Sequence, residues 1–128
     1  MTELFKRCLN ANYTHWGEGG DYAIQVEGDT LYDTHGAYLD SPRNVAKKLN
    51  VPFVDANKIT HELVQGLGRE ESKKLYMWVE PNTVPAVPKG SVDNTHLNIY
   101  GARVVAGLLV DAMAEVVPAL APYVRHYD

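Results

Sequence analysis

A short apolar run between two helical patterns constrains the fold of this chain more than any other feature of its sequence. The run occupies residues 51–55 (VPFVD) and directly follows a helical pattern over residues 41–49, which Ser41 can cap and in which Pro42 fits the first position. A second helical pattern opens at Thr60. A short apolar run that ends in aspartate, directly after a helix, is typical of a buried strand in a parallel sheet. The order of helix, strand and helix therefore predicts an α/β fold.

The helical patterns also predict which side chains face the core. Apolar residues on one side of a helix recur every three or four positions. In the first two helices the residues expected to face inward are Val45, Leu49, Leu63, Val64 and Leu67. We expect the second helix to close near Gly66 or Gly68. A further helical period covers residues 69–79.

The last predicted helix has the clearest start and end signals. Asn98 can cap it, and Pro118 is expected to end or kink it. Its apolar positions, which we expect to dock on a core, are Ile99, Ala102, Ala106, Leu109, Met113 and Val117. Before this helix, residues 80–92 contain several prolines and predict an irregular loop.

The first part of the chain carries weaker patterns. Residues 2–11 predict a short amphipathic helix. Residues 12–21 predict a loop, because three glycines within four positions lose too much backbone entropy in a helix. Residues 22–26 predict a strand that pairs with residues 30–32 across a turn at residues 27–29.

Length, charge and cysteine content exclude several protein classes. A chain of 128 residues has the size of one domain. Its net charge is −4 and its basic residues form only isolated pairs, so a nucleic-acid partner is not expected. Cys8 is the single cysteine, which excludes an internal disulfide and a cysteine-based zinc site. No membrane partner is expected, because the apolar stretch at residues 104–110 is too short to span a bilayer. Residues 1–11 lack the apolar core of a signal peptide.

One segment carries the residue types that acid–base chemistry requires. Asp93 lies three residues before His96, on a turn that leads into the last predicted helix. A carboxylate so placed can bind the imidazole Nδ1, which fixes the tautomer and leaves Nε2 to take a proton from a nucleophile. The residues alone also allow a turn aspartate and a histidine that bonds locally. No metal is expected, because His61 and Glu62 are followed by Gln65 where a zinc protease needs a second histidine.

Two further groups could contact a substrate. Asp33 and His35 could touch a sugar or shape a site, or they could simply form a loop turn that ends at Gly36. His15 and Trp16 lie in an aromatic loop that could stack on a sugar ring or pack as ordinary loop residues.

The segment around His96 resembles a known family. Residues 93–102 (DNTHLNIYGA) are similar to the last block of the SGNH, or GDSL-like, hydrolases, in the form found in rhamnogalacturonan acetylesterases and related carbohydrate esterases. Residues 33–38, 45–55 and 68–76 support the resemblance, which covers roughly residues 30–121.

This resemblance implies a fold and an activity. The fold would be a flavodoxin-like α/β/α sandwich, of which residues 30–128 form the C-terminal portion, while residues 1–29 stay unassigned. Asp93 and His96 would be the acid and base members of a site that removes acetyl groups from a pectic polysaccharide or a small ester, without a cofactor. The resemblance also suggests a secreted or periplasmic protein.

The same resemblance implies what such a site would need in addition. The family's nucleophilic serine lies in an early Gly-Asp-Ser block, and its oxyanion-hole glycine and asparagine lie in two further early blocks. None of these blocks is found in this sequence, whose serines are Ser41, Ser72 and Ser91. The alternative function is an inactive fragment that serves as a structural, oligomerising or saccharide-binding module. An incomplete sheet leaves an open strand edge, so both functions predict a homo-oligomer or pairing with another chain.

Overall fold

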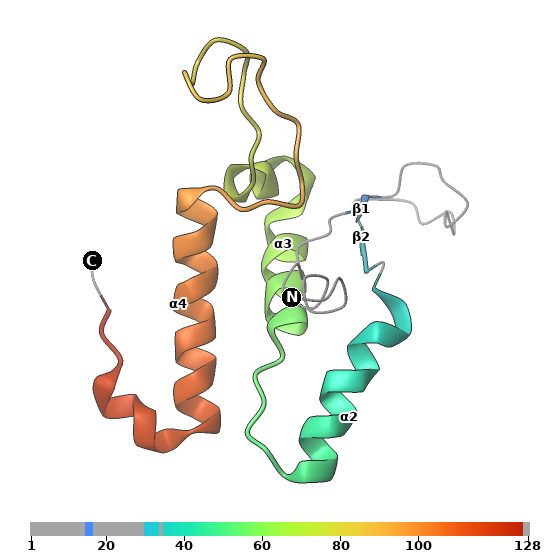
Figure 1. Cartoon of the computed structure of the whole chain (residues 1–128), viewed down its shortest axis with the longest axis vertical. Helices are drawn as coiled ribbons and strands as arrows, with labels where there is room; N and C mark the ends of the chain where they lie inside the picture. The colour runs from blue at the N-terminus through green and yellow to red at the C-terminus, as the bar shows by residue number, and fades with distance from the viewer. Residues whose placement is uncertain (1–14, 17–29, 34, 127–128) are drawn as a thin grey trace.

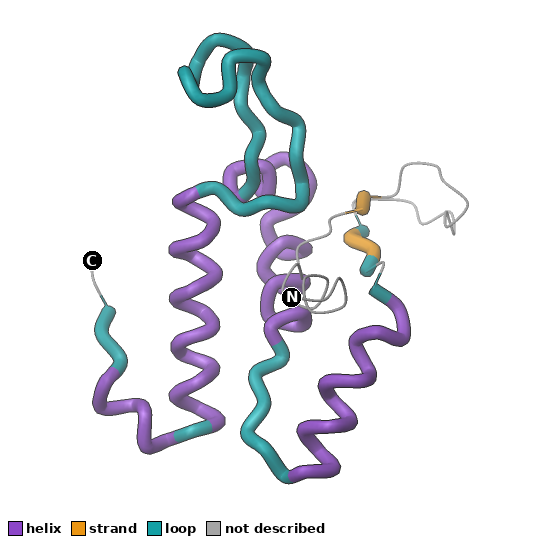
Figure 2. The backbone as a smooth tube through the Cα atoms, in the orientation of Figure 1, coloured by secondary structure: helices purple, strands orange, loops and turns teal. Residues whose placement is uncertain are grey.

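The computed structural model describes residues 15–16, 30–33 and 35–126, and within these ranges the protein is mainly helical. The elements, with η for a 3-10 helix, are β1 (His15–Trp16), β2 (Leu31–Tyr32), η1 (Gly36–Leu39), α2 (Asp40–Leu49), α3 (Ala56–Ser72), η2 (Lys73–Leu75), α4 (Ile99–Val116) and η3 (Pro118–Tyr123). In Figure 1, α3 stands between α4 and α2, and the chain between η2 and α4 projects beyond one end of the helices as an arm (residues 76–97). Figure 2 shows that this arm is built of loops and turns.

The strand expected at residues 30–32 forms, but with a partner that the sequence did not indicate. β2 pairs antiparallel with β1, so the loop predicted at residues 12–21 is interrupted by a short strand. The register places His15 opposite Tyr32 and Trp16 opposite Leu31. Three predictions lie outside the described residues: the strand at residues 22–26, the turn at residues 27–29 and the helix at residues 2–11.

The strand predicted at residues 51–55 is wrong. These residues connect α2 to α3 without regular secondary structure. A parallel strand is held by backbone hydrogen bonds to its neighbours, and the one sheet in the described ranges is the β1–β2 pair, which does not include this segment. The α/β fold predicted from this run is therefore not visible in the described part of the chain, and neither is the α/β/α sandwich that the family resemblance implies.

α2 occupies the predicted residues, but its cap and its inward face differ from the prediction. Ser41 lies inside the helix, and the N-cap residue is Leu39, which makes no side-chain capping bond. Because η1 leads directly into α2, the first turn of α2 continues a helical backbone and needs no capping side chain. Val45 and Leu49, predicted to face inward, are 52% and 64% exposed. No sheet among the described residues covers them.

α3 begins earlier than the predicted Thr60. Asp55 caps it by accepting the backbone N–H of Lys58 at 3.1 Å. The buried Thr60 hydroxyl instead donates to the backbone carbonyl of Ala56 at 2.8 Å. The predicted break at Gly68 is confirmed, because its φ of 79° and ψ of 175° interrupt the helix there.

The helical period predicted over residues 69–79 ends early. After η2 the backbone becomes extended at Tyr76. Two isolated antiparallel bridges then join the two sides of the arm, Tyr76 with Leu97 and Val79 with Ser91. Pairing across the arm therefore replaces the last predicted helical turn, and the irregular loop predicted at residues 80–92 is confirmed.

The small core lies where β2, α3 and the base of the arm meet. Its buried members are Leu31, Val64, Leu75 and Tyr76, with Leu63, Trp78, Leu97 and Val104 packed against them. Leu63 and Val64 therefore face inward as predicted. Leu67 does not, because it is 39% exposed.

α4 starts and ends as the sequence predicts. The Asn98 side chain accepts the backbone N–H of Gly101 at 2.8 Å, and the helix ends at Val116, before Pro118. α4 carries apolar residues on several sides and so lacks one dominant apolar face. None of the helices in the described ranges combines the length and apolar character needed to cross a bilayer.

The predicted inward face of α4 is wrong. Its buried residues are Gly101 and Val105, whereas Ile99 and Met113 are exposed. A Cβ atom at position 101 would lie 2.0 Å from the carbonyl oxygen of Leu75, so only glycine allows α4 to pass this close to the backbone. The close crossing at Gly101 decides which side of α4 faces the core. The periodicity of large apolar residues does not predict it, because glycine is not counted among them.

Candidate functional site

Asp93 and His96 are brought together on the turn that leads into α4. Asp93 Oδ1 accepts the backbone N–H groups of Thr95 at 2.6 Å and of His96 at 2.9 Å. The other carboxylate oxygen, Oδ2, lies 2.8 Å from His96 Nδ1. One aspartate therefore closes the turn and also contacts the imidazole. The local turn and the aspartate–histidine contact, the two interpretations drawn from the sequence, are both present.

The electrostatics of the turn fix the histidine tautomer. Burial pushes the pKa of Asp93 upward, but the hydrogen bonds from the His96 and Thr95 backbone and from the His96 ring outweigh it, so the pKa lies below its usual value. The carboxylate is therefore ionised at neutral pH and can only accept hydrogen bonds. A neutral His96 ring beside it must carry its proton on Nδ1, which leaves the Nε2 lone pair available.

The exposure of the two side chains differs in a way that suits acid–base chemistry. The Asp93 side chain is 28% exposed and the His96 side chain is 70% exposed. A base must reach the proton that it takes. The His96 ring is therefore largely exposed to solvent, while the carboxylate that orients it is more sheltered.

The turn is anchored to the opposite side of the arm through its backbone. The Met77 N–H donates to the His96 carbonyl at 3.0 Å, and the Asn98 N–H donates to the Leu75 carbonyl at 2.9 Å. The Asn98 amide group also donates to the carbonyls of Lys74 and Tyr76, at 2.8 and 2.9 Å. Asn98 therefore caps α4 and joins the arm to it at the same time.

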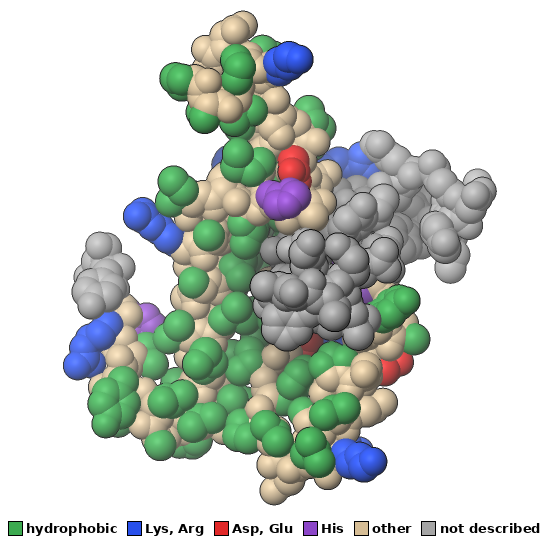
Figure 3. Space-filling model, in the orientation of Figure 1, with side chains coloured by type: hydrophobic (Ala, Val, Ile, Leu, Met, Phe, Trp, Pro, Cys, Tyr) green, Lys and Arg blue, Asp and Glu red, His purple; other side chains and the backbone are tan. Residues whose placement is uncertain are grey.

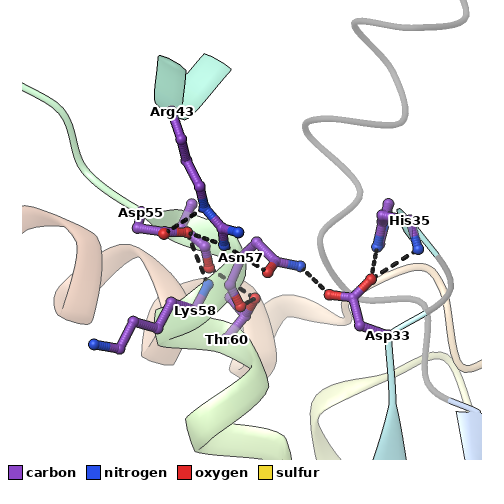
Figure 4. A network of polar contacts seen from close by, with 8 residues as sticks. Asp33, His35, Arg43, Asp55, Asn57, Lys58 and Thr60 are labelled. Atoms are coloured by element: carbon purple, nitrogen blue, oxygen red, sulfur yellow. Dashed lines mark hydrogen bonds and ion pairs between the residues drawn. The ribbon is translucent and has the colours of Figure 1, made fainter. Parts of the chain in front are cut away.

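A second aspartate–histidine pair lies at Asp33 and His35, before α2. Asp33 Oδ1 lies 2.7 Å from His35 Nδ1 and accepts the His35 backbone N–H at 2.8 Å. Asp33 Oδ2 accepts the side-chain amide of Asn57 at 2.6 Å. Asn57 is also bonded to Arg43, which forms a two-pronged ion pair with Asp55 at 2.8 and 3.1 Å (Figure 4).

This second pair is part of a network that joins three elements. Asp33 follows β2, Arg43 comes from α2, and Asp55 is the N-cap of α3. Burial raises the pKa of Asp33 and of Asp55, but the hydrogen bonds from Asn57 and His35 to the first, and from Arg43 and Lys58 to the second, leave both pKa values below the usual range. The loop turn predicted at Asp33 and His35 is present, and the network connects it to α2 and α3. A contact between His35 and a sugar stays a prediction.

Comparison with curated proteins identifies a relative. The chain is 39% identical over 89 residues to the rhamnogalacturonan acetylesterase RhgT of Bacillus subtilis (strain 168), a match that covers 70% of this chain and 38% of that enzyme. The chain is a partial homologue of an SGNH hydrolase. No protein-family model matches the chain. No solved structure matches it either.

This homology confirms the family resemblance drawn from the sequence. The helices described above therefore form a fragment related to an α/β fold, and the chain spans well under half the length of the curated relative that it matches. The division of the chain at residue 30 and the roles of Asp93 and His96 stay predictions.

The serines of this SGNH homologue do not complete the pair. Ser41 lies in α2, Ser91 forms a bridge with Val79, and the buried Ser72 hydroxyl donates to the Arg69 carbonyl at 3.0 Å. No hydrogen bond joins any of these hydroxyls to the His96 ring, and all three serines are within the described residues.

The other predicted site residue, Trp16, is placed only in part. Its backbone lies in β1 opposite Leu31, and its side chain lies outside what the structure describes. Whether it contacts a sugar therefore stays a prediction. Within the described ranges, no group of three or more histidine, cysteine, aspartate or glutamate side chains could hold a metal ion.

Sequence reasoning missed two polar contacts of the homologue. The Trp78 indole N–H donates to Asn94 Oδ1 at 2.6 Å, beside the Asp93 turn. Asn57 links the Asp33 and Arg43 groups. The only signal for the first contact is general, since a largely buried tryptophan N–H nearly always finds a partner. No pattern in the sequence indicates the second.

Proposed function

We propose that this chain carries the acid–base part of a carbohydrate-esterase site of the SGNH type, which removes acetyl groups from a pectic polysaccharide of the rhamnogalacturonan kind. The observation that carries this proposal is the 2.8 Å contact between His96 Nδ1 and Asp93 Oδ2, with the histidine ring largely open to solvent. The homology to an enzyme described as a rhamnogalacturonan acetylesterase supports the substrate class.

The chemistry assigned to the pair is acyl transfer through a serine hydroxyl supplied from outside these 128 residues. His96 Nε2 takes the hydroxyl proton as the serine oxygen bonds to the acetyl carbon, and Asp93 stabilises the imidazolium that forms. The imidazolium then gives the proton to the departing sugar oxygen. In the second half, His96 deprotonates a water molecule that attacks the acetyl-serine. Acetate leaves, and the serine recovers its proton.

We also infer that α2, α3 and α4 are helices of a flavodoxin-like α/β/α sandwich and pair with another chain or with a second copy. Several apolar side chains of α2, α4 and η3 support this inference because they are exposed: Val45, Leu49, Met113, Val116, Leu120 and Tyr123. Figure 3 shows apolar side chains spread over the part of this face where the C-terminal ends of α2 and α4 lie. A helix that is apolar on several sides is normally covered on several sides.

The same apolar surface favours a second candidate function, an oligomerising or saccharide-binding module without turnover. Size-exclusion chromatography with light scattering tests the association that both functions require. We expect a dimer or larger assembly, and a stable monomer at high concentration would contradict the inferred pairing.

A hybrid enzyme tests the esterase function directly. The 89 matched residues of this chain replace their counterparts in the B. subtilis enzyme, which supplies the remainder of the domain. We expect the hybrid to release acetate from acetylated rhamnogalacturonan, and His96→Ala to lower its kcat by about 10³-fold or more. A folded hybrid without activity, or one that is indifferent to His96→Ala, would contradict the proposal and leave the binding module as the better function.

A further inference from the structure

The Asp93 turn needs an anchor beyond its own hydrogen bonds. The hydrogen bonds that Asp93 accepts from Thr95 and His96 are all local, since they join residues at most three positions apart. They close the turn but do not fix it relative to the rest of the protein. The anchors described above reach the backbone of His96 and the residue Asn98, on the C-terminal side of the turn.

The other side of the turn is held by a side chain. Asn94, the residue directly after Asp93, accepts the Trp78 indole N–H at 2.6 Å, and this is a contact between residues sixteen positions apart. Trp78 lies on the opposite side of the arm and packs against the buried core. The contact therefore ties the start of the turn to the core.

The Trp78 ring is itself held in place. The Lys73 ammonium lies over its face, 4.6 Å from the ring centre. Lys73 is in turn paired with Glu70 at 2.7 Å. A cation over an indole face is attracted by the negative charge of the π cloud. The indole N–H is thus presented to Asn94 from a ring that is fixed by packing and by a charge.

We propose that Trp78 is a positioning residue, which acts through Asn94 to hold the Asp93 carboxylate against His96 Nδ1. The positioning role itself does not depend on the esterase function. Only the catalytic role of the Asp93–His96 pair rests on that proposed function. Without the indole N–H, the Asp93 side of the turn loses its tie to the core while the His96 side stays anchored. The contact between Asp93 Oδ2 and His96 Nδ1 therefore weakens, and the ring is held less firmly in the Nδ1–H tautomer.

The tautomer of His96 is the measurement that tests this inference, because a loss of global stability alone would not change it. The whole chain is labelled with ¹⁵N, and the imidazole nitrogens are read by long-range ¹H–¹⁵N NMR at a pH where the rings are neutral. Five histidines give signals, and His96→Gln assigns the one of interest.

Trp78→Phe keeps an aromatic ring and deletes the N–H. We expect it to lower the ratio of Nδ1–H to Nε2–H tautomer at His96 by about fivefold, the effect of one ordinary hydrogen bond on an equilibrium. Asn94→Ala removes the same bond from its other partner and should give the same change. In the double variant the change should not increase further. An unchanged ratio in Trp78→Phe or in Asn94→Ala would overturn the proposal.

Tyr76→Phe is the matched control. Tyr76 lies two residues away on the same side of the arm, and its buried hydroxyl has no hydrogen-bond partner among the described residues. Deleting that hydroxyl should leave the His96 tautomer ratio as it is, and an equal fall in this variant would overturn the proposal. The hybrid assay separates the two claims. Acetate release with an unchanged ratio defeats the positioning role alone, whereas a lowered ratio without acetate release defeats the esterase function alone.

Discussion

The turn at Asp93 and the turn at Asp33 have the same local chemistry in different surroundings. In each, an aspartate oxygen lies within 2.8 Å of a histidine Nδ1, and the aspartate also accepts a backbone N–H of its own turn. The His96 side chain is 70% exposed, whereas the His35 side chain is 9% exposed. Among the described residues, Asp93 contacts groups of its own turn, while Asp33 also accepts from Asn57 in α3.

The difference teaches that an aspartate–histidine contact alone does not identify acid–base chemistry. The two turns differ in the solvent exposure of the histidine ring and in the hydrogen bonds that the aspartate makes outside its own turn. The Asp33 carboxylate joins the segment after β2 to α3, so its loss should weaken the fold. The Asp93 carboxylate is assigned to the ring of an open histidine, so its loss should weaken catalysis.

The largest expected effect separates the two aspartates by activity. In the hybrid enzyme, Asp93→Asn should lower kcat by about 10⁴-fold, because an amide cannot stabilise the imidazolium and favours the wrong tautomer. Asp33→Asn, measured by the same acetate-release assay, should leave kcat within a few-fold of the parent hybrid. Similar losses in both variants would remove the distinction between the turns.

Stability should show the reverse order. Asp33→Ala leaves Asn57 and His35 without their shared acceptor, and we expect it to lower the free energy of unfolding by about 2 kcal/mol. Asp93→Ala removes bonds within one exposed turn and should cost about 1 kcal/mol or less. Urea unfolding of the isolated chain measures both. A larger loss for Asp93→Ala would contradict the structural role given to Asp33.

Acid should weaken the network around Asp33 through its carboxylates. The folded-state pKa values of Asp33 and Asp55 lie below their usual values, so both groups add stability that is present above about pH 4 and is lost as the pH falls through the folded-state pKa values. The free energy of unfolding should therefore fall between pH 6 and pH 3. Asp33→Asn, unfolded in urea at both pH values, should show a smaller fall than the unaltered chain. An equal fall would mean that Asp33 does not contribute.

The smallest expected effect concerns the ion pair at the end of the network. Arg43→Lys keeps the charge but cannot bond both oxygens of Asp55 and the Asn57 amide together. Because the Arg43 side chain is 37% exposed, we expect a loss of only about 0.5 kcal/mol. Thermal unfolding of Arg43→Lys measures this loss. Lys58→Arg, at an exposed neighbouring position, is the control. A loss of several kcal/mol would place the centre of the network at Arg43 instead of Asp33.

The sequence predicted local features better than packing. The Asn98 cap, the break at Gly68, the stop at Pro118 and the Asp93–His96 contact all depend on neighbouring residues, and the structure contains all four. The strand at residues 51–55 and the inward face of α2 depend on a sheet that the described residues do not contain. The spacing of apolar residues predicts which side of a helix is suited to burial. It does not predict whether a sheet or another helix is present to cover that side.

The direct test of the central claim is labelling of the hybrid enzyme with a fluorophosphonate, followed by intact mass. This reagent reacts with a serine activated by a base, so it reports on the histidine without a choice of substrate. We predict that the hybrid is labelled once, that His96→Ala slows labelling by about 10³-fold or more, and that His35→Ala leaves the rate nearly unchanged. Labelling that persists in His96→Ala, or that is lost equally in His35→Ala, would contradict the assignment of the open turn to acid–base chemistry and the closed turn to structure.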